Sequence, residues 1–480
     1  GVPNGISNQP LDQRYRFDVY GNLKTQWHAG AWGGTGTARG KETYQYDALH
    51  RLTQASRTSS DNATTSIDYG YNAIGGLLKK SDYSANTPSA YSYAANSHRV
   101  NQVALNTGGT ATYGFDDNGN VTQRNEAGSI TTLRYDIANL PQRMTRGFNT
   151  ADFYEGPSGR FLQRMVSNGT QRDTYHLEKS YERELVNNAP SVERYYLSSG
   201  VMLLVKPNEA RKLNYLHTDR LGSPVAISEK QLPIDGRLGN ALSVTVEHKG
   251  FDAFGKALDG QWGISNLGML NLSPVSTGMN FGKRNQRGFT GHEHLDEFAL
   301  IHMNGRAYDY NLGRFYGVDP IVQFPSNSQS LNPYAYLMNN PLSGTDPTGY
   351  CKSSSTNGDT ATCTLDVPEN GESVEKTFTG KIGADGVVKF EGKGTNSIGN
   401  IVTGPNSSHQ VTVTNGAQAS GGSYGGLFGG GNLSQSTKIH ELGSNQYRRA
   451  STIKTGAEGN SDARAQTDAM ASDLAILPVA

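Results

Sequence analysis

Aromatic residues alternate with polar ones in short stretches along roughly the first 140 residues. Residues two positions apart lie on the same face of a β-strand, so each stretch predicts a strand with one aromatic face. The alternating pairs are Tyr15/Phe17, Tyr44/Tyr46, Tyr69/Tyr71, Tyr91/Tyr93, Tyr113/Phe115 and Leu133/Tyr135.

A polar turn follows each pair. It usually opens with Asp or Asn and carries a Gly or Asn two to four residues further on. An Asp or Asn side chain accepts hydrogen bonds from its own backbone, and Gly or Asn supplies a positive φ. A Leu or Val then begins a return strand, so each unit predicts a hairpin. The turn markers are Asp18, Asp47, Asn72, Ala94, Asp116 and Asp136, at steps of 29, 25, 22, 22 and 20 residues.

A single hairpin cannot bury its apolar face, but hairpins stacked side by side can. The repeated units therefore predict one long sheet and a mainly β fold. Composition agrees, because the 480 residues include 58 Gly, and 25 Tyr against 15 Phe. The charge is balanced at 43 basic and 43 acidic residues, which gives no sign of a surface for nucleic acid. No apolar run is long enough to predict a membrane-spanning helix.

The two cysteines, Cys351 and Cys363, are too few for a disulfide-rich scaffold or a four-cysteine zinc site. Their separation of twelve residues fits either one local disulfide or two free thiols.

Longer motifs continue the pattern downstream. They are Tyr-x-His-x-Asp-x-x-Gly-Ser-Pro at 215–224, Phe-Asp-Ala-Phe-Gly at 251–255, and a run from 287 to 350 that contains Gly-Arg-Ala-Tyr-Asp, Leu-Gly-Arg-Phe and Asp-Pro-Thr-Gly-Tyr. Over about residues 10–350 the chain resembles the YD-repeat proteins of the Rhs family and the C components of insecticidal toxin complexes.

The resemblance implies an architecture. Residues 1–212 would form a spiralling β-shell of YD-repeat hairpins, and 213–350 would form the Rhs-associated core that plugs the shell. Residues 351–480 would be a variable toxin passenger, folded as a small separate β-rich (α+β) segment. We expect the chain to be the C-terminal part of a longer protein, whose first strand is an open edge.

The resemblance also implies an aspartyl autoprotease that cuts between Tyr350 and Cys351. The motif at the cut is Asp346, Pro347, Gly349 and Tyr350, with Tyr350 where many relatives have Leu. The chemistry needs two carboxylates that share a proton.

Asp309 and Asp319 are the candidate carboxylates, ten residues apart around what looks like a tight bend. Arg306 is the candidate residue to hold one of them ionised. Two plainer interpretations stay open, because Asp-Pro pairs open turns and Arg306 can simply form an ion pair. Asp346 fits the recognised sequence better than a catalytic role.

His292, His294 and Asp296 raise the possibility of a metal site, but no third ligand is evident, and we expect neither metal nor cofactor. His217 fits a packed histidine that is hydrogen-bonded to backbone.

The last 130 residues show a different pattern. Alternating stretches at 362–367, 387–390 and 410–414 predict strands, the Gly-rich run at 421–431 predicts a linker, and 460–475 predicts a helix. Ten basic and twelve acidic residues argue mildly against a nuclease. His440-Glu441 resembles the start of a zincin helix, but Ser444 stands where a second His is needed.

The predicted function is a secreted or cell-surface bacterial toxin of the polymorphic Rhs type. Its partners would be its own passenger, an immunity protein and a secretion machinery, with no nucleic acid evident. The alternative is a structural, wall-associated protein whose repeats bind carbohydrate and whose tail is inert. A third interpretation makes the tail a degenerate peptidase.

Overall fold

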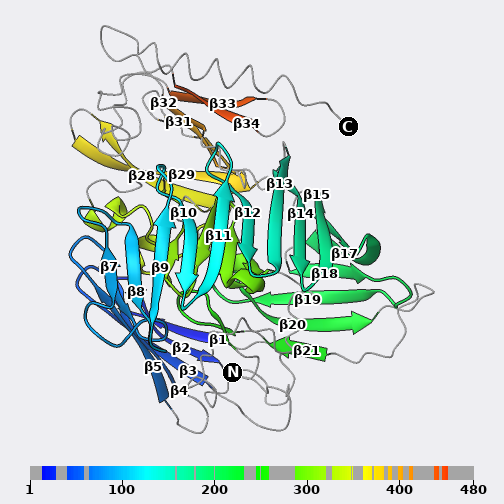
Figure 1. Cartoon of the computed structure of the whole chain (residues 1–480), viewed down its shortest axis with the longest axis horizontal. Helices are drawn as coiled ribbons and strands as arrows, with labels where there is room; N and C mark the ends of the chain where they lie inside the picture. Colours follow the sequence, from blue (N-terminus) through cyan, green and yellow to red (C-terminus); the bar gives the residue numbers. More distant parts are fainter. Residues whose placement is uncertain are drawn as a thin grey trace.

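The computed structural model describes residues 13–28, 40–58, 64–156, 159–177, 180–198, 200–231, 245–248, 250–258, 287–319, 327–347 and 349, and the backbone of strands between 360 and 451 (Figure 1). Apart from short 3-10 turns, the described residues form strands and loops, with no α-helix among them. The predicted mainly β fold class is confirmed.

The first sheet has six strands in chain order: β1 (Gln13–Phe17), β2 (Leu23–His28), β3 (Gly40–Tyr46), β4 (Leu52–Thr58), β5 (Thr64–Tyr71) and β6 (Leu77–Lys80). Every pair of neighbours is antiparallel. The predicted stacking of hairpins into a continuous sheet is therefore confirmed for this part of the chain.

The second sheet has fifteen strands, again in chain order (Figure 1). They are β7 (Tyr91–Tyr93), β8 (Val100–Ala104), β9 (Thr110–Phe115), β10 (Val121–Glu126), β11 (Ser129–Tyr135), β12 (Pro141–Arg146), β13 (Asn149–Gly156), β14 (Gly159–Ser167), β15 (Thr170–Leu177), β16 (Tyr181–Val186), β17 (Ala189–Ser198), β18 (Val201–Val205), β19 (Lys212–Thr218), β20 (Pro224–Gln231) and β21 (Thr245–His248). The sheet runs without a break across position 212, where a change from shell to core was predicted.

The turns have the predicted chemistry. Asp18 Oδ1 accepts from the amides of Tyr20 and Asn22, both at 2.9 Å, and Gly21 has a φ of +82°. The same pattern of side-chain oxygen and amides at i+2 and i+4 recurs at Asp47, Asn72, Asp136, Asp219 and Asp252. The turn therefore also occurs downstream of the six aromatic pairs, at Asp219 and Asp252.

At four places among the described residues a tyrosine hydroxyl joins consecutive repeats. The second aromatic of a pair donates to the backbone carbonyl of the Leu or Val that begins the previous return strand. The bonds are Tyr46 to Leu23 (2.9 Å), Tyr71 to Leu52 (2.8 Å), Tyr93 to Leu77 (2.6 Å) and Tyr135 to Val121 (2.8 Å). The first aromatic of most pairs and the Leu or Val itself are buried, so the aromatic face is the inner face of the sheet.

The core segment follows the second sheet and consists of short pieces. They are β22 (Gly250–Phe251), β23 (Ala257–Leu258), η2 (Phe289–Gly291), β24 (Glu293–Leu295), η3 (Asp296–Phe298), β25 (Leu300–Met303), β26 (Arg306–Asp309), β27 (Arg314–Phe315), η4 (Ser328–Leu331) and η5 (Leu337–Asn339). In Figure 1 this segment, green to yellow, lies behind β9–β12. Almost every residue from 298 to 317 is buried.

The core contacts the turns of the repeats. Arg314, Asn332 and Asn339 all donate to the carbonyl of Gly75, at 2.8, 3.0 and 3.0 Å. Asn340 Nδ2 donates to Asn22 Oδ1 at 3.0 Å, across 318 positions of sequence. These long-range bonds fasten the core against the inner side of the first hairpins.

The C-terminal strands are β28 (Thr360–Glu369), β29 (Glu372–Ile382), β30 (Val388–Glu391), β31 (Ile398–Thr403), β32 (Gln410–Val413), β33 (Thr437–Leu442) and β34 (Gln446–Ser451). β28, β30 and β32 confirm the three predicted strands. His440 lies in β33, so the comparison with a zincin helix is wrong, because a strand does not bring residues i and i+4 together as a helix does. The predicted linker, the predicted helix at 460–475 and Cys351 lie outside the described residues.

Candidate functional site

Arg306, the first residue of β26, is the centre of the candidate site. Its side chain is 2% exposed and lies over the ring of Phe315, with Cζ 3.7 Å from the ring centroid. Nη1 donates to the carbonyl of Pro333 at 3.1 Å. The guanidinium is therefore fixed by packing and by backbone, and its remaining nitrogens face two carboxylates and the chain ahead of the predicted cut.

The two carboxylates belong to Asp319 and Asp346. Arg306 Nη2 lies 3.0 Å from Asp319 Oδ2 and 3.4 Å from Asp346 Oδ2, so one nitrogen links both side chains. Asp346 is 6% exposed and Asp319 is 17% exposed. A planar guanidinium between two carboxylates balances part of their charge and keeps them close together.

Arg306 also holds the chain just before the predicted cut. Its Nε donates to the carbonyl of Gly349, and Asn304 Nδ2 donates to the carbonyl of Pro347 at 2.7 Å. Gly349 has a φ of +79°, and a Cβ there would lie 2.2 Å from the carbonyl oxygen of Met303. Only glycine fits this close approach, which explains in physical terms why the motif has Gly at this position.

Asp309 lies on the opposite face of β26, because it is three residues from Arg306 and side chains alternate along a strand. It is fully buried. Oδ2 accepts from Arg124 Nη1 at 2.8 Å and from the Tyr316 hydroxyl at 2.6 Å, and Oδ1 accepts from the amides of Asn311 and Leu312. Its contacts join β26 to β10 and to the turn that follows β26.

The structure therefore brings Arg306, Asp319 and Asp346 together and places Asp309 on the other face of the strand. Tyr350 and Cys351 lie outside the described residues. Sequence reasoning missed Asn304 and Arg124. Asn304 stands in an Asn-Gly pair between β25 and β26, a hairpin signal that points to a turn and says nothing about Pro347.

The chemistry available at this site is that of two acidic groups beside a held peptide segment. A carboxylate that is ionised can accept a proton from water, and a neighbouring carboxyl that is protonated can polarise a carbonyl. The site thus has the groups that acid–base cleavage of a peptide needs, within reach of the segment that carries the motif.

His292 and His294 both make hydrogen bonds to nearby residues. His294 Nε2 accepts from the Phe289 amide at 3.0 Å, and His292 Nδ1 pairs with the Thr290 hydroxyl at 2.8 Å. Among the described residues, no group of three His, Cys, Asp or Glu side chains is arranged to hold a metal ion.

His217 was expected to bond to backbone. Its Nε2 instead pairs with the hydroxyl of Ser228 at 2.8 Å, on the neighbouring strand β20. Burial lowers the pKa of His217 below its ordinary value, so the ring is neutral near pH 7.

Within the described residues, no helix has the length and hydrophobicity of a membrane span.

Comparison with known proteins gives relatives in sequence and in structure, while no family model matches the chain. The "tRNA3(Ser)-specific nuclease WapA" of Bacillus spizizenii and the "tRNA nuclease WapA" of Bacillus subtilis are each 24% identical over 312 residues, 64% of this chain and 11% of the relative. "Salivary gland surface protein 1" of Aedes aegypti is 39% identical over 61 residues, 13% of this chain and 2% of the relative. The chain thus spans about a tenth of the length of the WapA proteins.

Among solved structures, TcdB2-TccC3 without its hypervariable C-terminal region covers 71% of this chain at 16% identity, with a TM-score of 0.47. The match spans 17% of that chain. The Photorhabdus luminescens Tc holotoxin pore covers 71% of this chain and 20% of its own at 15% identity, with a TM-score of 0.33.

Proposed function

We propose that the chain is an Rhs-type YD-repeat protein and part of a secreted bacterial polymorphic toxin that cuts itself after Tyr350. Residues up to 350 form the shell and its core, and residues 351–480 are the passenger that the cut releases from the covalent chain. The WapA relatives, which are named as nucleases, support the toxin class. The near-neutral charge of 351–480 lends no support to a nuclease in this passenger.

One observation carries the self-cleavage proposal. Arg306 contacts Asp319 and Asp346 and at the same time binds the carbonyl of Gly349, one residue before Tyr350. Positioning of this kind makes a cut within one chain effectively unimolecular. The entropy of bringing the groups together is then already paid, and this lowers the barrier to peptide hydrolysis.

In this proposal the ionised carboxylate of Asp319 accepts a proton from the attacking water, and the positive charge of Arg306 stabilises that carboxylate. Asp346 is the second carboxylate nearest to the held segment, and Asn304 and Arg306 are positioning residues. Asp309 has a positioning role: its hydrogen bonds to Arg124 and Tyr316 hold β26, the strand that carries Arg306, in place. This differs from an Asp309–Asp319 pair, and the variants below separate the two versions.

The test is the size of the purified chain in a denaturing gel. Wild type is expected to run as two pieces, the smaller beginning at Cys351, and the two are expected to stay together in a native column because the shell encloses the passenger. Asp319→Asn is expected to leave one intact chain, because the amide keeps the size of the side chain but not its proton chemistry. Asp117→Asn, at an exposed repeat turn, is the matched control and is expected to cut normally.

The choice of second carboxylate follows from two further variants. Asp346→Asn is expected to stay intact. If Asp309→Asn folds, by circular dichroism, and stays intact while Asp346→Asn cuts, the pair is Asp309 and Asp319. A wild-type chain that stays whole over days of incubation rules out self-cleavage altogether.

The toxin proposal has its own experiment. Production of 351–480 in bacteria without an immunity protein is expected to stop growth, and production of 1–350 is expected to be harmless. Harmless expression of both segments would favour the structural, carbohydrate-binding alternative over the toxin.

A further inference from the structure

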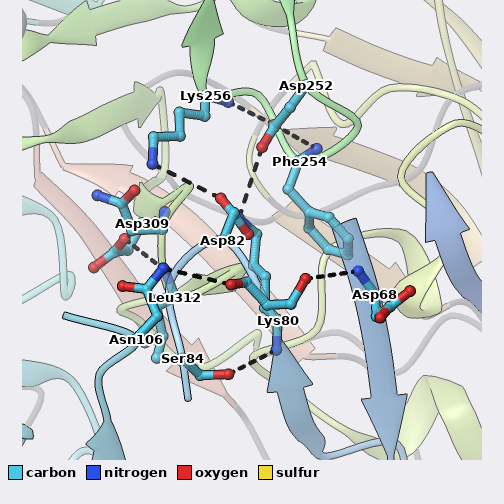
Figure 2. Close-up of polar contacts among 12 residues, drawn as sticks. Asp68, Lys80, Asp82, Ser84, Asn106, Asp252, Phe254, Lys256, Asp309 and Leu312 are labelled. Atoms are coloured by element: carbon cyan, nitrogen blue, oxygen red, sulfur yellow. Dashed lines mark hydrogen bonds and ion pairs between the residues drawn. The ribbon is translucent and has the colours of Figure 1, made fainter. Parts of the chain in front are cut away.

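Four charged side chains meet inside the molecule where the two repeat sheets part (Figure 2). Lys80 is the last residue of β6, and Asp82 stands in the turn that separates β6 from β7. Asp252 and Lys256 belong to the turn between β22 and β23, in the core segment. The group therefore joins a repeat hairpin to the core, two parts of the chain about 170 residues apart.

The distances within the group are short and its burial is deep. Lys80 Nζ lies 2.7 Å from both oxygens of Asp82 and 3.6 Å from Asp252 Oδ2, and Lys256 Nζ lies 3.7 Å from Asp82 Oδ2. The side chains of Lys80 and Asp82 are 0% and 1% exposed. In Figure 2 the polar ends of Lys256, Asp82 and Asp252 turn toward one another.

Two atoms of this group lack a hydrogen-bond partner within the described part of the chain: Lys256 Nζ and Asp252 Oδ2. Asp252 Oδ1 is occupied by the amides of Phe254 and Lys256, at 2.9 and 2.8 Å, which directs Oδ2 at the group. Buried polar atoms of native proteins are nearly always hydrogen-bonded, so these two atoms, whose ion-pair contacts to Asp82 and Lys80 are longer than a hydrogen bond, need an explanation.

The surroundings favour neutral side chains. Phe254, Tyr83 and Tyr69 are buried nearby, and the rings of Tyr69 and Phe254 lie 5.0 Å apart. Burial lowers the pKa of Lys256, and burial raises the pKa of Asp252. For Lys80, burial opposes the charge, but the carboxylates of Asp82 and Asp252 raise its pKa above the ordinary value. Burial thus works against both charges, the ammonium of Lys256 and the carboxylate of Asp252, and favours the neutral forms of the two groups.

We infer that Lys256 and Asp82 form an intramolecular isopeptide bond, with Asp252 as the proton relay and Lys80 as the cation that stabilises the negative charge of the intermediate. A lysine amine that is neutral and desolvated is a nucleophile, and the Asp82 carboxyl, with Oδ2 3.7 Å from Lys256 Nζ, is the group that it can attack. The group has the nucleophile, the acceptor, the acid and the stabilising cation that such a bond needs.

The atoms of the step balance. Lys256 first loses one proton from its ammonium, the neutral Nζ then attacks Cγ of Asp82, and the nitrogen loses a second proton; Asp252 passes both protons to one carboxyl oxygen of Asp82. That oxygen leaves as water, and the N–C bond replaces the C–O bond. One positive and one negative charge disappear from the interior, and no oxidant, reductant or second reactant takes part.

The bond would tie the core to the repeats at the seam between the sheets. It is independent of the proposed self-cleavage, since both residues precede the predicted cut. The product would resist opening of the shell at that seam even when the noncovalent contacts are lost.

The experiment is a mass measurement on the denatured full chain and on its tryptic peptides. The mass of the uncut chain is expected to be one water lower than the sequence mass. If the chain is cut, hydrolysis adds one water, so the summed mass of the two pieces is expected to equal the sequence mass instead of exceeding it by one water. Trypsin is expected to give a branched peptide that joins 81–99 to 250–283, because modified Lys256 is no longer a cleavage site. Linear peptides 81–99 and 250–256 with the full sequence mass would overturn the inference and leave a buried ion cluster.

Variants assign the roles. Lys256→Arg and Asp82→Ala are expected to restore the full mass. Lys79→Arg, at the partly exposed position before Lys80 in β6, is the matched control that keeps the branched peptide. Asp252→Asn is expected to slow bond formation at least tenfold in freshly refolded chain. A branched peptide formed at the wild-type rate in Asp252→Asn would overturn the relay role. If the variants fail to fold, the wild-type mass alone still decides whether the bond exists.

Discussion

The repeat hairpins and the core are both antiparallel β-structure, but different kinds of contact hold them together. In the repeats, the contacts are local: the hairpins have their own side-chain-capped turns, and at four places a tyrosine bonds to the hairpin before it. In the core, strands of two to four residues are held by buried Arg and Asp side chains that contact distant parts of the chain.

The difference has a thermodynamic meaning. A stack in which each unit contacts its neighbours has a stability close to the sum of its units and interfaces. Asp309 accepts hydrogen bonds from several segments of the chain at once, so its removal leaves buried donors such as Arg124 without a partner. We therefore expect small, additive effects in the repeats and large, collective effects in the core.

The largest expected effect is at Asp309. Asp309→Asn removes the charge that pairs with buried Arg124, and breaking a buried pair in this way costs about 3–5 kcal/mol. The measurement is urea denaturation followed by circular dichroism. The same chemical change at Asp152, whose partner Arg143 is 46% exposed, is expected to cost less than about 1 kcal/mol. Equal losses at the two sites would break the comparison.

A second large effect is the pH dependence of stability at His176. This residue lies in β15 of the repeat sheet, so a large effect is also expected outside the core. Burial lowers the pKa of His176 to about 4, with Arg160 acting in the same direction and Glu182 opposing it. An unfolded histidine titrates near 6.5, so unfolding takes up a proton between these two values. The stability from neutral His176 is complete above about pH 6.5 and is lost as the pH falls through about 4.

The size of this pH effect is about 3 kcal/mol, from the difference of the two pKa values. His176→Gln is expected to flatten the fall in unfolding free energy between pH 7 and pH 4 by that amount. His217→Gln, at a half-buried position, is the control and is expected to change the slope less. Identical pH profiles for wild type and His176→Gln would contradict the buried, neutral histidine.

A smaller effect is expected at a repeat turn. Asn72 Oδ1 accepts from the amides of Ile74 and Gly76 at 3.1 and 2.7 Å. Asn72→Ala is expected to cost about 1–2 kcal/mol, the range for removing a side chain that caps backbone amides. The midpoint of thermal unfolding gives the measurement, and a loss above about 4 kcal/mol would mean that the repeats are as collective as the core.

The smallest effects test additivity. Tyr46→Phe and Tyr135→Phe each remove one hydroxyl bond to the neighbouring repeat and are expected to cost about 1 kcal/mol apiece. The two sites share no partner, so the double variant is expected to cost the sum, within about 0.5 kcal/mol. A marked deviation from the sum, measured by denaturation of all four chains, would show that the repeats couple over long distances.

The repeats could be predicted from sequence because their determinants are local. The side chain of Asp18 meets amides two and four residues away, and the aromatic pairs fix which face is buried. The tyrosine bond between repeats was not predicted, since its acceptor is a backbone carbonyl 14 to 23 residues away, as in Tyr135 and Tyr46.

The candidate site was predictable only in part. Arg306 and Asp319 contact each other as expected, because both flank the same short hairpin. The strand β26 places Asp309 on the opposite face from Arg306, and this separation follows from sequence only once residues 306–309 are known to form a strand. The contact of Lys80 with Asp252 joins segments with no local signal in common.

The hydrogen bond between Asn340 and Asn22 sets an order of events during synthesis. Each hairpin needs only residues already made, so the sheet can assemble progressively as the chain leaves the ribosome. Asn340 can close its contact only after 318 further residues exist, and closure of so long a loop carries an entropic cost that grows with its length. The core thus completes last, and the segment at Gly349 comes to lie beside Arg306 only in a chain whose repeats are already in place.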